Sequence, residues 1–161
     1  MWLIMAIDKV KEYFKKFGRE EDVLEFNESS ATVHDAALAI GCDEAHIAKT
    51  MSFWVDDKPI LIVLAGDTKV DNPKYKQKFG CKAKMIQADE LECVIGHAAG
   101  GVCPFAINEG ITVYLDESLK RFEYVYPACG SASSAIKLTI PELGEYSNFK
   151  EWIDVGKLKE D

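Results

Sequence analysis

The sequence has no long apolar segment and no basic run placed ahead of an apolar one. A helix that crosses a membrane needs about 20 apolar residues in a row, and no stretch of this chain approaches that length. Residues 1–7 are apolar, but no basic residue precedes them and Asp8 and Lys9 follow at once. This is a poor match to a secretory signal. We therefore expect a cytoplasmic protein with no membrane partner.

Cysteine and histidine are too few and too scattered for a disulfide framework or a metal centre. The five cysteines include no C-x-x-C pair, and no cysteine and histidine stand at zinc-finger spacing. The three histidines, His34, His46 and His97, lack the i, i+4 spacing of metal ligands on a helix. We expect reduced thiols, no metal and no cofactor.

Net positive charge is also lacking. The formal charge of −8 argues against indiscriminate nucleic-acid binding and against a DNA partner, because phosphate affinity comes from clustered cations. Residues 68–84 differ, since they hold six lysines and one aspartate, a local charge of +5. This stretch is either a solvated lysine-rich face or an RNA-contacting face on an acidic protein. The candidate RNA contacts are Lys69, Lys74, Lys76 and Lys78.

The hydrophobic pattern mixes helical and strand periods, with short connections and no internal repeat. An amphipathic helix is predicted over residues 2–17, where apolar residues recur at steps of three and four. Further helices are predicted over 32–40, 73–79 and 88–96 and from Pro141 onward. Strands are predicted over 22–27, 47–55, 60–65, 83–86, 111–115, 123–126 and 135–140. Hairpin-length and helix-length connections alternate, which predicts a single α/β domain over residues 1–161 with a mixed, partly antiparallel sheet flanked by helices.

Residues 96–107, Gly-His-Ala-Ala-Gly-Gly-Val-Cys-Pro-Phe-Ala-Ile, have the composition of a loop that approaches a ligand closely. Two adjacent glycines allow left-handed dihedrals and a close approach of backbone. The amides of Gly100, Gly101 and Val102 would converge on an oxygen and form an oxyanion cradle. The alternative is an ordinary Gly-Gly turn between a helix and a strand.

Three other positions leave two interpretations open. Lys49 lies at the start of an apolar strand, where it either points outward or points inward to an anion or carbonyl. Asp67 follows the next apolar strand as a turn former or as a group that orients another. Gly130 and Ser131 lie between two predicted strands, where a plain turn is the simpler interpretation.

Cys103 suggests a nucleophile, with His97 six residues earlier as its base. Reactive cysteines need a positioned cation or a helix N-terminus that stabilises the thiolate. Nothing in the sequence supplies one, so a structural thiol is favoured over a thioester or amide hydrolase.

Five short motifs follow one another over residues 25–146. They are Ala31-Thr32-Val33, His46-Ile47-Ala48-Lys49-Thr50-Met51, Gly66-Asp67, the segment from Gly96 to Phe105, and Ala128-Cys129-Gly130-Ser131 with Ile136-Lys137-Leu138. In this order they resemble the YbaK/prolyl-tRNA-synthetase-associated editing-domain family of aminoacyl-tRNA deacylases. The first helix and the tail after Ser147 lie outside the match. Cys103 and Ala106 depart from the residues that are common in the family.

The resemblance implies a mixed-sheet domain that hydrolyses the ester between a wrong amino acid and tRNA, without a metal or a covalent intermediate. Lys49 would anchor the terminal adenosine or its phosphate, and Gly100 and Gly101 would cradle the carbonyl oxygen. Substrate-binding roles fall on Val102, His97, Asp67, Gly130 and Ser131.

We expect a free-standing trans-editing enzyme for a small amino acid such as alanine or cysteine, acting at the 3′ end of a tRNA such as tRNA(Pro). A synthetase is a further partner to consider. The alternative is a module of the same fold that binds tRNA or a synthetase without hydrolysis.

Overall fold

The computed structural model describes residues 6–27 and 32–159. The α-helices in these ranges are α1 (Ala6–Lys15), α2 (Val33–Ile40), α3 (Asn72–Phe79), α4 (Leu91–Val94) and α5 (Ile140–Ser147). The strands are β1 (Leu24–Glu25), β2 (Ile47–Val55), β3 (Lys58–Ala65), β4 (Thr68–Val70), β5 (Thr112–Asp116), β6 (Tyr124–Pro127), β7 (Ser134–Ala135), β8 (Leu138–Thr139), β9 (Glu151–Ile153) and β10 (Gly156–Leu158). Short 3-10 helices cover Glu20–Asp22, Glu44–His46, Ala88–Glu90 and Glu117–Arg121.

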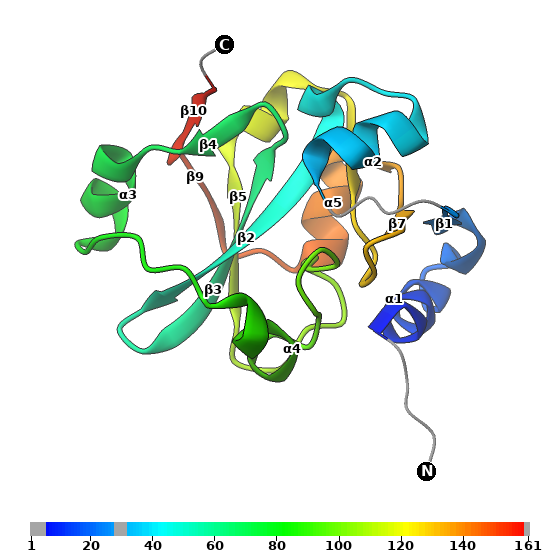
Figure 1. Ribbon diagram of the computed structural model, residues 1–161, viewed down its shortest axis with the longest axis horizontal. Coiled ribbons are helices and arrows are strands. Elements are labelled where there is room, and N and C mark those ends of the chain that lie inside the picture. The colour runs from blue at the N-terminus through cyan, green and yellow to red at the C-terminus, as the bar shows by residue number, and fades with distance from the viewer. Residues whose placement is uncertain (1–5, 28–31, 160–161) are drawn as a thin grey trace.

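A six-stranded mixed sheet in the order β8-β6-β2-β3-β5-β9 forms the centre of the molecule (Figure 1). β2 and β3 form the predicted hairpin, and both central residues of its turn, Asp56 and Asp57, have positive φ. Positive φ at both positions is the turn geometry that matches the right-handed twist of paired strands. β3 pairs with β5, and β5 with β9, in parallel. The predicted mixed, partly antiparallel α/β fold is confirmed.

The sheet is covered on both faces. On one face, Phe14 of α1 and Leu143 of α5 join a core that includes Leu61 and Val63 of β3. On the other face, Tyr75 of α3 packs with Ile62 of the same strand. Because β3 is buried on both faces, its apolar residues run without alternation. Figure 1 shows α1 and α3 at opposite sides of the sheet.

The predicted helix ends agree with the capping residues in the sequence. The Thr32 side chain accepts a hydrogen bond from the Asp35 amide at 3.0 Å, and α2 ends at Gly41, which has φ of 84°. Thr139 and Glu142 form a capping box at the start of α5, where Pro141 lies in the first turn. These caps satisfy amides that have no partner within the helix.

Several predicted elements are corrected. Residues 83–86 make only an isolated bridge between Met85 and Phe53, rather than a strand. Residues 135–140 are not one strand: they hold the last residue of β7, all of β8 and the first residue of α5. The chain crosses there from a pairing with β1 to the edge at β6. The helix predicted over 88–96 is a 3-10 turn followed by one turn of α4. Residues 2–5 of the first predicted helix lie outside the described residues.

The tail after Ser147 adds two strands that the sequence pattern did not predict. β9 extends the main sheet beside β5, and β10 pairs with β4 in a separate two-stranded ribbon. The tail therefore packs against the centre of the molecule.

Candidate active site

The main sheet has a gap along the outer edge of β2. β6 pairs with β2 only at Ile47 and Ala48. Further along β2, the Trp54 amide donates to the Lys84 carbonyl at 2.9 Å and the Ile86 amide donates to the Ser52 carbonyl at 3.1 Å. Backbone groups alternate sides along a strand, so the amide and carbonyl of Thr50 face the same edge of β2 as those of Ser52 and Trp54. They lie between the pairing with β6 and the hydrogen bonds to residues 84–86.

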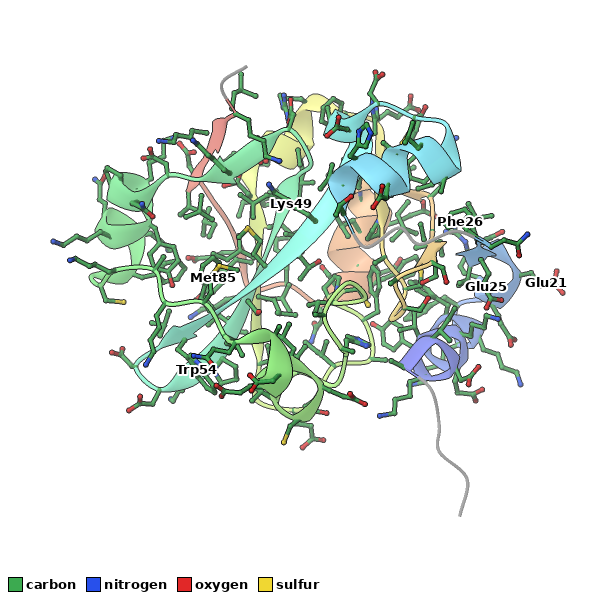
Figure 2. The ribbon with its side chains drawn as sticks, in the orientation of Figure 1. Glu21, Glu25, Phe26, Lys49, Trp54 and Met85 are labelled. Carbon is green, nitrogen blue, oxygen red and sulfur yellow. The ribbon has the colours of Figure 1, made fainter. Side chains whose placement is uncertain are left out.

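A pocket of about 300 Å³ lies at this gap. Figure 2 labels Lys49 and Met85, two of the side chains that line it. The polar residues in the lining are Thr32, Lys49, Thr50, Ser52, Tyr126 and Ser134. The apolar residues are Val33, Ala36, Ile47, Ala48, Met51, Met85, Ile86, Ala88, Leu91, Ala99, Gly100, Val102, Ala128 and Ala135. Lys49 is the only charged side chain among them, so the pocket suits a small apolar group bound beside an anion.

Lys49 points inward to a carbonyl, one of the two alternatives that the sequence left open. Its ammonium donates a hydrogen bond to the Thr68 carbonyl of β4. Burial and then the nearby positive charge of Lys159 together lower the pKa of Lys49 to about 8, while Asp67 opposes the shift. An anion bound beside Lys49 would favour the charged form of this side chain.

The glycine loop, residues 96–107, forms part of the pocket wall. Gly100, with φ of 90°, and Val102 line the pocket. Their amides have no hydrogen-bond partner in the described part of the chain. The Gly101 amide instead donates to the Ala98 carbonyl at 3.0 Å. Of the three amides expected to converge on an oxygen, the one on Gly101 is thus already engaged in a turn.

Gly101 has a second role, because it lets two loops touch. A Cβ atom at Gly101 would lie 2.6 Å from the Gly130 carbonyl carbon and 2.7 Å from the Ser131 amide. Such distances are too short for any side chain. Gly130 in turn has φ of 92° and lies against the Ala6 carbonyl at the start of α1. Gly101, Gly130 and Ser131 therefore support the pocket wall from behind.

Ser131 and Ser134 stabilise the turn between β6 and β7. The Ser131 hydroxyl donates to the Ser134 hydroxyl oxygen at 2.8 Å, and the Ser134 hydroxyl donates to the Ser131 carbonyl at 3.2 Å. Ser134 is the member of this pair that lines the pocket. Ser131 was predicted from the sequence as a site residue, whereas Ser134 was not.

His97 and Cys103 are brought together, but in the core behind the loop. The Cys103 sulfur lies 3.5 Å from His97 Nε2, and both residues are fully buried. His97 Nε2 is 2.7 Å from the Phe105 carbonyl, so it carries the proton and donates. Burial raises the pKa of the Cys103 thiol to about 12 and lowers the pKa of His97. The geometry supports a neutral structural pair rather than a nucleophile and base.

Asp67 lies beside the site rather than in the pocket lining. Arg121 donates to both of its carboxylate oxygens, at 2.5 and 3.0 Å. These bonds lower the pKa of Asp67. The pair fixes the turn between β3 and β4 that carries the Thr68 carbonyl, the partner of Lys49.

Two of the four candidate RNA-contacting lysines form ion pairs with the tail, and two do not. Lys74 contacts Asp154 at 3.0 Å, and Lys78 contacts Glu151. Lys69 and Lys76 are exposed and make no ion pair with another described residue. The four candidate RNA contacts therefore differ in how much free charge they offer.

Thr50 and Ser52 were missed by the sequence analysis, although a signal was present. They alternate with apolar residues along β2, the pattern of a strand with one distinct face. The Thr50 hydroxyl oxygen is buried without a hydrogen-bond partner in the described residues. A buried polar group of this kind costs roughly 1–3 kcal/mol unless a partner binds it.

Neither residues 6–27 nor residues 32–159 contain a group of three or more His, Cys, Asp or Glu side chains arranged to hold a metal ion. In the same ranges no helix has the length and apolar character needed to cross a membrane.

Solved structures share this fold and define the class of protein. The crystal structure of a candidate trans-editing enzyme for prolyl tRNA synthetase has a TM-score of 0.85 and 25% sequence identity, and the match covers 97% of this chain and 99% of that one. The crystal structure of the hypothetical protein APE2540 has a TM-score of 0.80 and 26% identity, covering 92% of this chain and 99% of that one. The molecule thus shares its α/β fold with these two proteins.

Sequence comparison gives the family. The model of the aminoacyl-tRNA editing domain matches residues 27–146. The uncharacterized protein YwhH of Bacillus subtilis (strain 168) is 52% identical over 154 residues, covering 95% of this chain and 98% of that protein. The proline--tRNA ligase of Streptococcus sanguinis (strain SK36) is 23% identical over 119 residues, but the match spans only 19% of that ligase. The chain belongs to the aminoacyl-tRNA editing domain family, and the resemblance stated from the sequence is confirmed.

Proposed function

We propose that this protein is a trans-editing deacylase that hydrolyses the ester of a mischarged tRNA carrying a small amino acid, alanine or cysteine, on tRNA(Pro). One observation carries the proposal. The chain belongs to the aminoacyl-tRNA editing domain family, and Lys49 is the one charged side chain among the described residues of its pocket. Lys49 shares this pocket with Gly100 and Val102, whose amides have no partner in the described chain. An anion site and an oxyanion site are the two parts that ester hydrolysis at the end of an RNA requires.

In this mechanism Lys49 binds the phosphate of the terminal adenosine and fixes the ester in the gap beside β2. The amides of Gly100 and Val102 donate to the ester carbonyl oxygen as negative charge develops there. One such donor contributes about 3 kcal/mol of transition-state stabilisation. Gly101 positions the other two amides by its turn and by its contact with Gly130.

The chemical step needs no protein nucleophile. Water attacks the ester carbonyl carbon and the bond to the ribose oxygen breaks. The amino acid leaves as its carboxylate, and the ribose oxygen takes up a proton. The neighbouring ribose hydroxyl orients the water, so catalysis comes from positioning on the enzyme. A cysteinyl substrate has a second route, in which its own thiol attacks the ester carbonyl carbon and forms a cyclic thioester. The bond to the ribose oxygen breaks, and that oxygen takes up the proton that the thiol loses.

A small amino acid is favoured by the pocket lining. Ala36, Ala48, Ala99 and Ala128 contribute short side chains, and the described lining contains no carboxylate that would bind a cationic one. A single methylene changes selectivity by only about 1–3 kcal/mol. Alanine and cysteine are therefore both candidates. The setting of this activity is the cytoplasm, beside the prolyl-tRNA synthetase that makes the error.

The test is hydrolysis of alanyl- and cysteinyl-tRNA(Pro), with other small aminoacyl-tRNAs alongside, by the wild type and by Lys49→Ala. We expect release of one amino acid well above the spontaneous rate, and loss of that release in the variant. Release that survives in Lys49→Ala would overturn the role of Lys49. Binding of tRNA without release from any substrate would instead select a non-catalytic module.

A further inference from the structure

The tail brings a second cation to Lys49. β10 pairs antiparallel with β4, with Leu158 opposite Thr68. The next residue, Lys159, donates its amide to the Asp67 carbonyl at 2.9 Å, while Lys49 donates its ammonium to the Thr68 carbonyl. The Lys49 ammonium and the Lys159 backbone amide are thus held on adjacent carbonyls, and the charge of the Lys159 side chain acts on Lys49.

The same ribbon carries a second pair of like charges. Lys157 lies directly opposite Lys69 in the register of β10 and β4. Like charges at opposed positions of a strand pair are destabilising. Asp71, 3.3 Å from the Lys157 ammonium, offsets one of them. Lys69 is exposed and has no ion-pair partner among the residues that the structure describes.

Two lysines of α3 differ from Lys69 because they form ion pairs with the tail. Lys74 and Lys78 of α3 are held by Asp154 and Glu151 of the tail. The tail therefore neutralises part of α3 while it adds cations beside the pocket. Figure 1 shows β10 alongside β4 at the end of the molecule where the described chain finishes.

We propose that the β4–β10 ribbon is the surface on which this protein binds the single-stranded 3′ end of its RNA. Lys159 joins Lys49 at the phosphate of the terminal nucleotide, and Lys69 and Lys157 bind phosphates further from the end. Each phosphate between two lysines relieves a repulsion that the free protein carries. The inference rests on the proposed function, and it draws on strand β10, which lies after the family match at residues 27–146.

The experiment compares two triple variants of the full chain with equal loss of charge. The ribbon variant is Lys69→Gln, Lys157→Gln and Lys159→Gln. The matched control is Lys15→Gln, Lys58→Gln and Lys150→Gln, which removes three exposed lysines at the end of α1, in the β2–β3 hairpin and after α5. Circular dichroism first establishes that both variants fold and melt like the wild type.

Two readouts follow. Fluorescence anisotropy measures binding of deacylated tRNA(Pro) from 50 to 200 mM KCl, and deacylation kinetics give kcat and KM for the aminoacyl-tRNA and for an aminoacyl-adenosine without phosphate. Each lost contact to a single strand lowers the slope of log K against log salt by about 0.7. Three contacts predict a change of slope of about 2 and an affinity loss of more than about tenfold at 150 mM salt.

We expect the ribbon variant to raise Kd and the KM for aminoacyl-tRNA, to keep kcat, and to leave the KM for aminoacyl-adenosine unchanged. Equal Kd and salt slope in the ribbon variant and the wild type would overturn the inference, as would a larger loss in the control variant. If the wild type binds tRNA but hydrolyses nothing, the proposed function fails while the binding readout still decides the role of the ribbon.

Discussion

Replacing Lys49 by methionine should make the protein more stable while removing its activity. Methionine has a similar length and needs no counter-charge. The pKa of Lys49 falls from 10.5 to about 8 on folding, which corresponds to roughly 3 kcal/mol of destabilisation when the group is protonated. Loss of the hydrogen bond to the Thr68 carbonyl offsets about 1 kcal/mol of this gain. The net gain in the free energy of unfolding at pH 7 is then about 2 kcal/mol.

The pH dependence of this gain has a definite sign. Between pH 8 and pH 10.5 the unfolded chain keeps a proton on Lys49 that the folded protein has released. Stability rises with pH wherever the unfolded state binds more protons. The wild type therefore recovers stability relative to Lys49→Met as the pH rises through this window, and below pH 8 the penalty is present in full.

Urea unfolding followed by tryptophan fluorescence at pH 7 and pH 9.5 measures both effects. For a chain of this size, 2 kcal/mol also raises Tm by about 4–8 °C. Lys82→Met, at an exposed position, is the control and should change the free energy of unfolding by less than about 0.5 kcal/mol. A Lys49→Met variant that is less stable than the wild type at pH 7, or a stability gap that widens with pH, would refute the reasoning.

Two further substitutions test the loops behind the pocket. Gly101→Ala should cost about 1–3 kcal/mol of stability and most of the deacylation, because its Cβ would lie 2.6 Å from the Gly130 carbonyl carbon. Gly144→Ala, in α5, is the control and should keep its activity in the same urea and deacylation assays. Cys103→Ser should retain deacylation within about threefold, because burial raises the pKa of its thiol to about 12. Complete loss of activity in a folded Cys103→Ser protein would restore the nucleophile hypothesis.

Local sequence signals predicted most of the fold. The apolar run from Ile60 to Ala65 is typical of a strand covered on both faces, and it forms most of β3 in the middle of the sheet. Thr32 and Gly41 marked the ends of α2 correctly. Features that depend on distant pairing were not predictable in this way. β9 and β10 are three residues each and are stabilised by β5 and β4, far away in the sequence.

In the candidate site, too, residues with a local sequence signal were predictable and features that depend on distant contacts were not. Lys49 and the glycine loop stood out because a lysine in an apolar strand and two adjacent glycines are locally unusual. The pocket between them lies where β6 has stopped pairing with β2 and the bridge between Met85 and Phe53 has not yet begun. No local sequence pattern encodes that gap. The engagement of the Gly101 amide by the Ala98 carbonyl is likewise a property of the folded loop.

A crystal structure with alanyl-adenosine, in which an amide replaces the ester so that it cannot be hydrolysed, would show how the pocket binds its substrate. We expect the alanyl group in the gap beside β2, its carbonyl oxygen within hydrogen-bonding distance of the Gly100 and Val102 amides, and the adenosine toward Lys49. An empty pocket at saturating analogue, or an analogue bound elsewhere on the protein, would contradict this expectation.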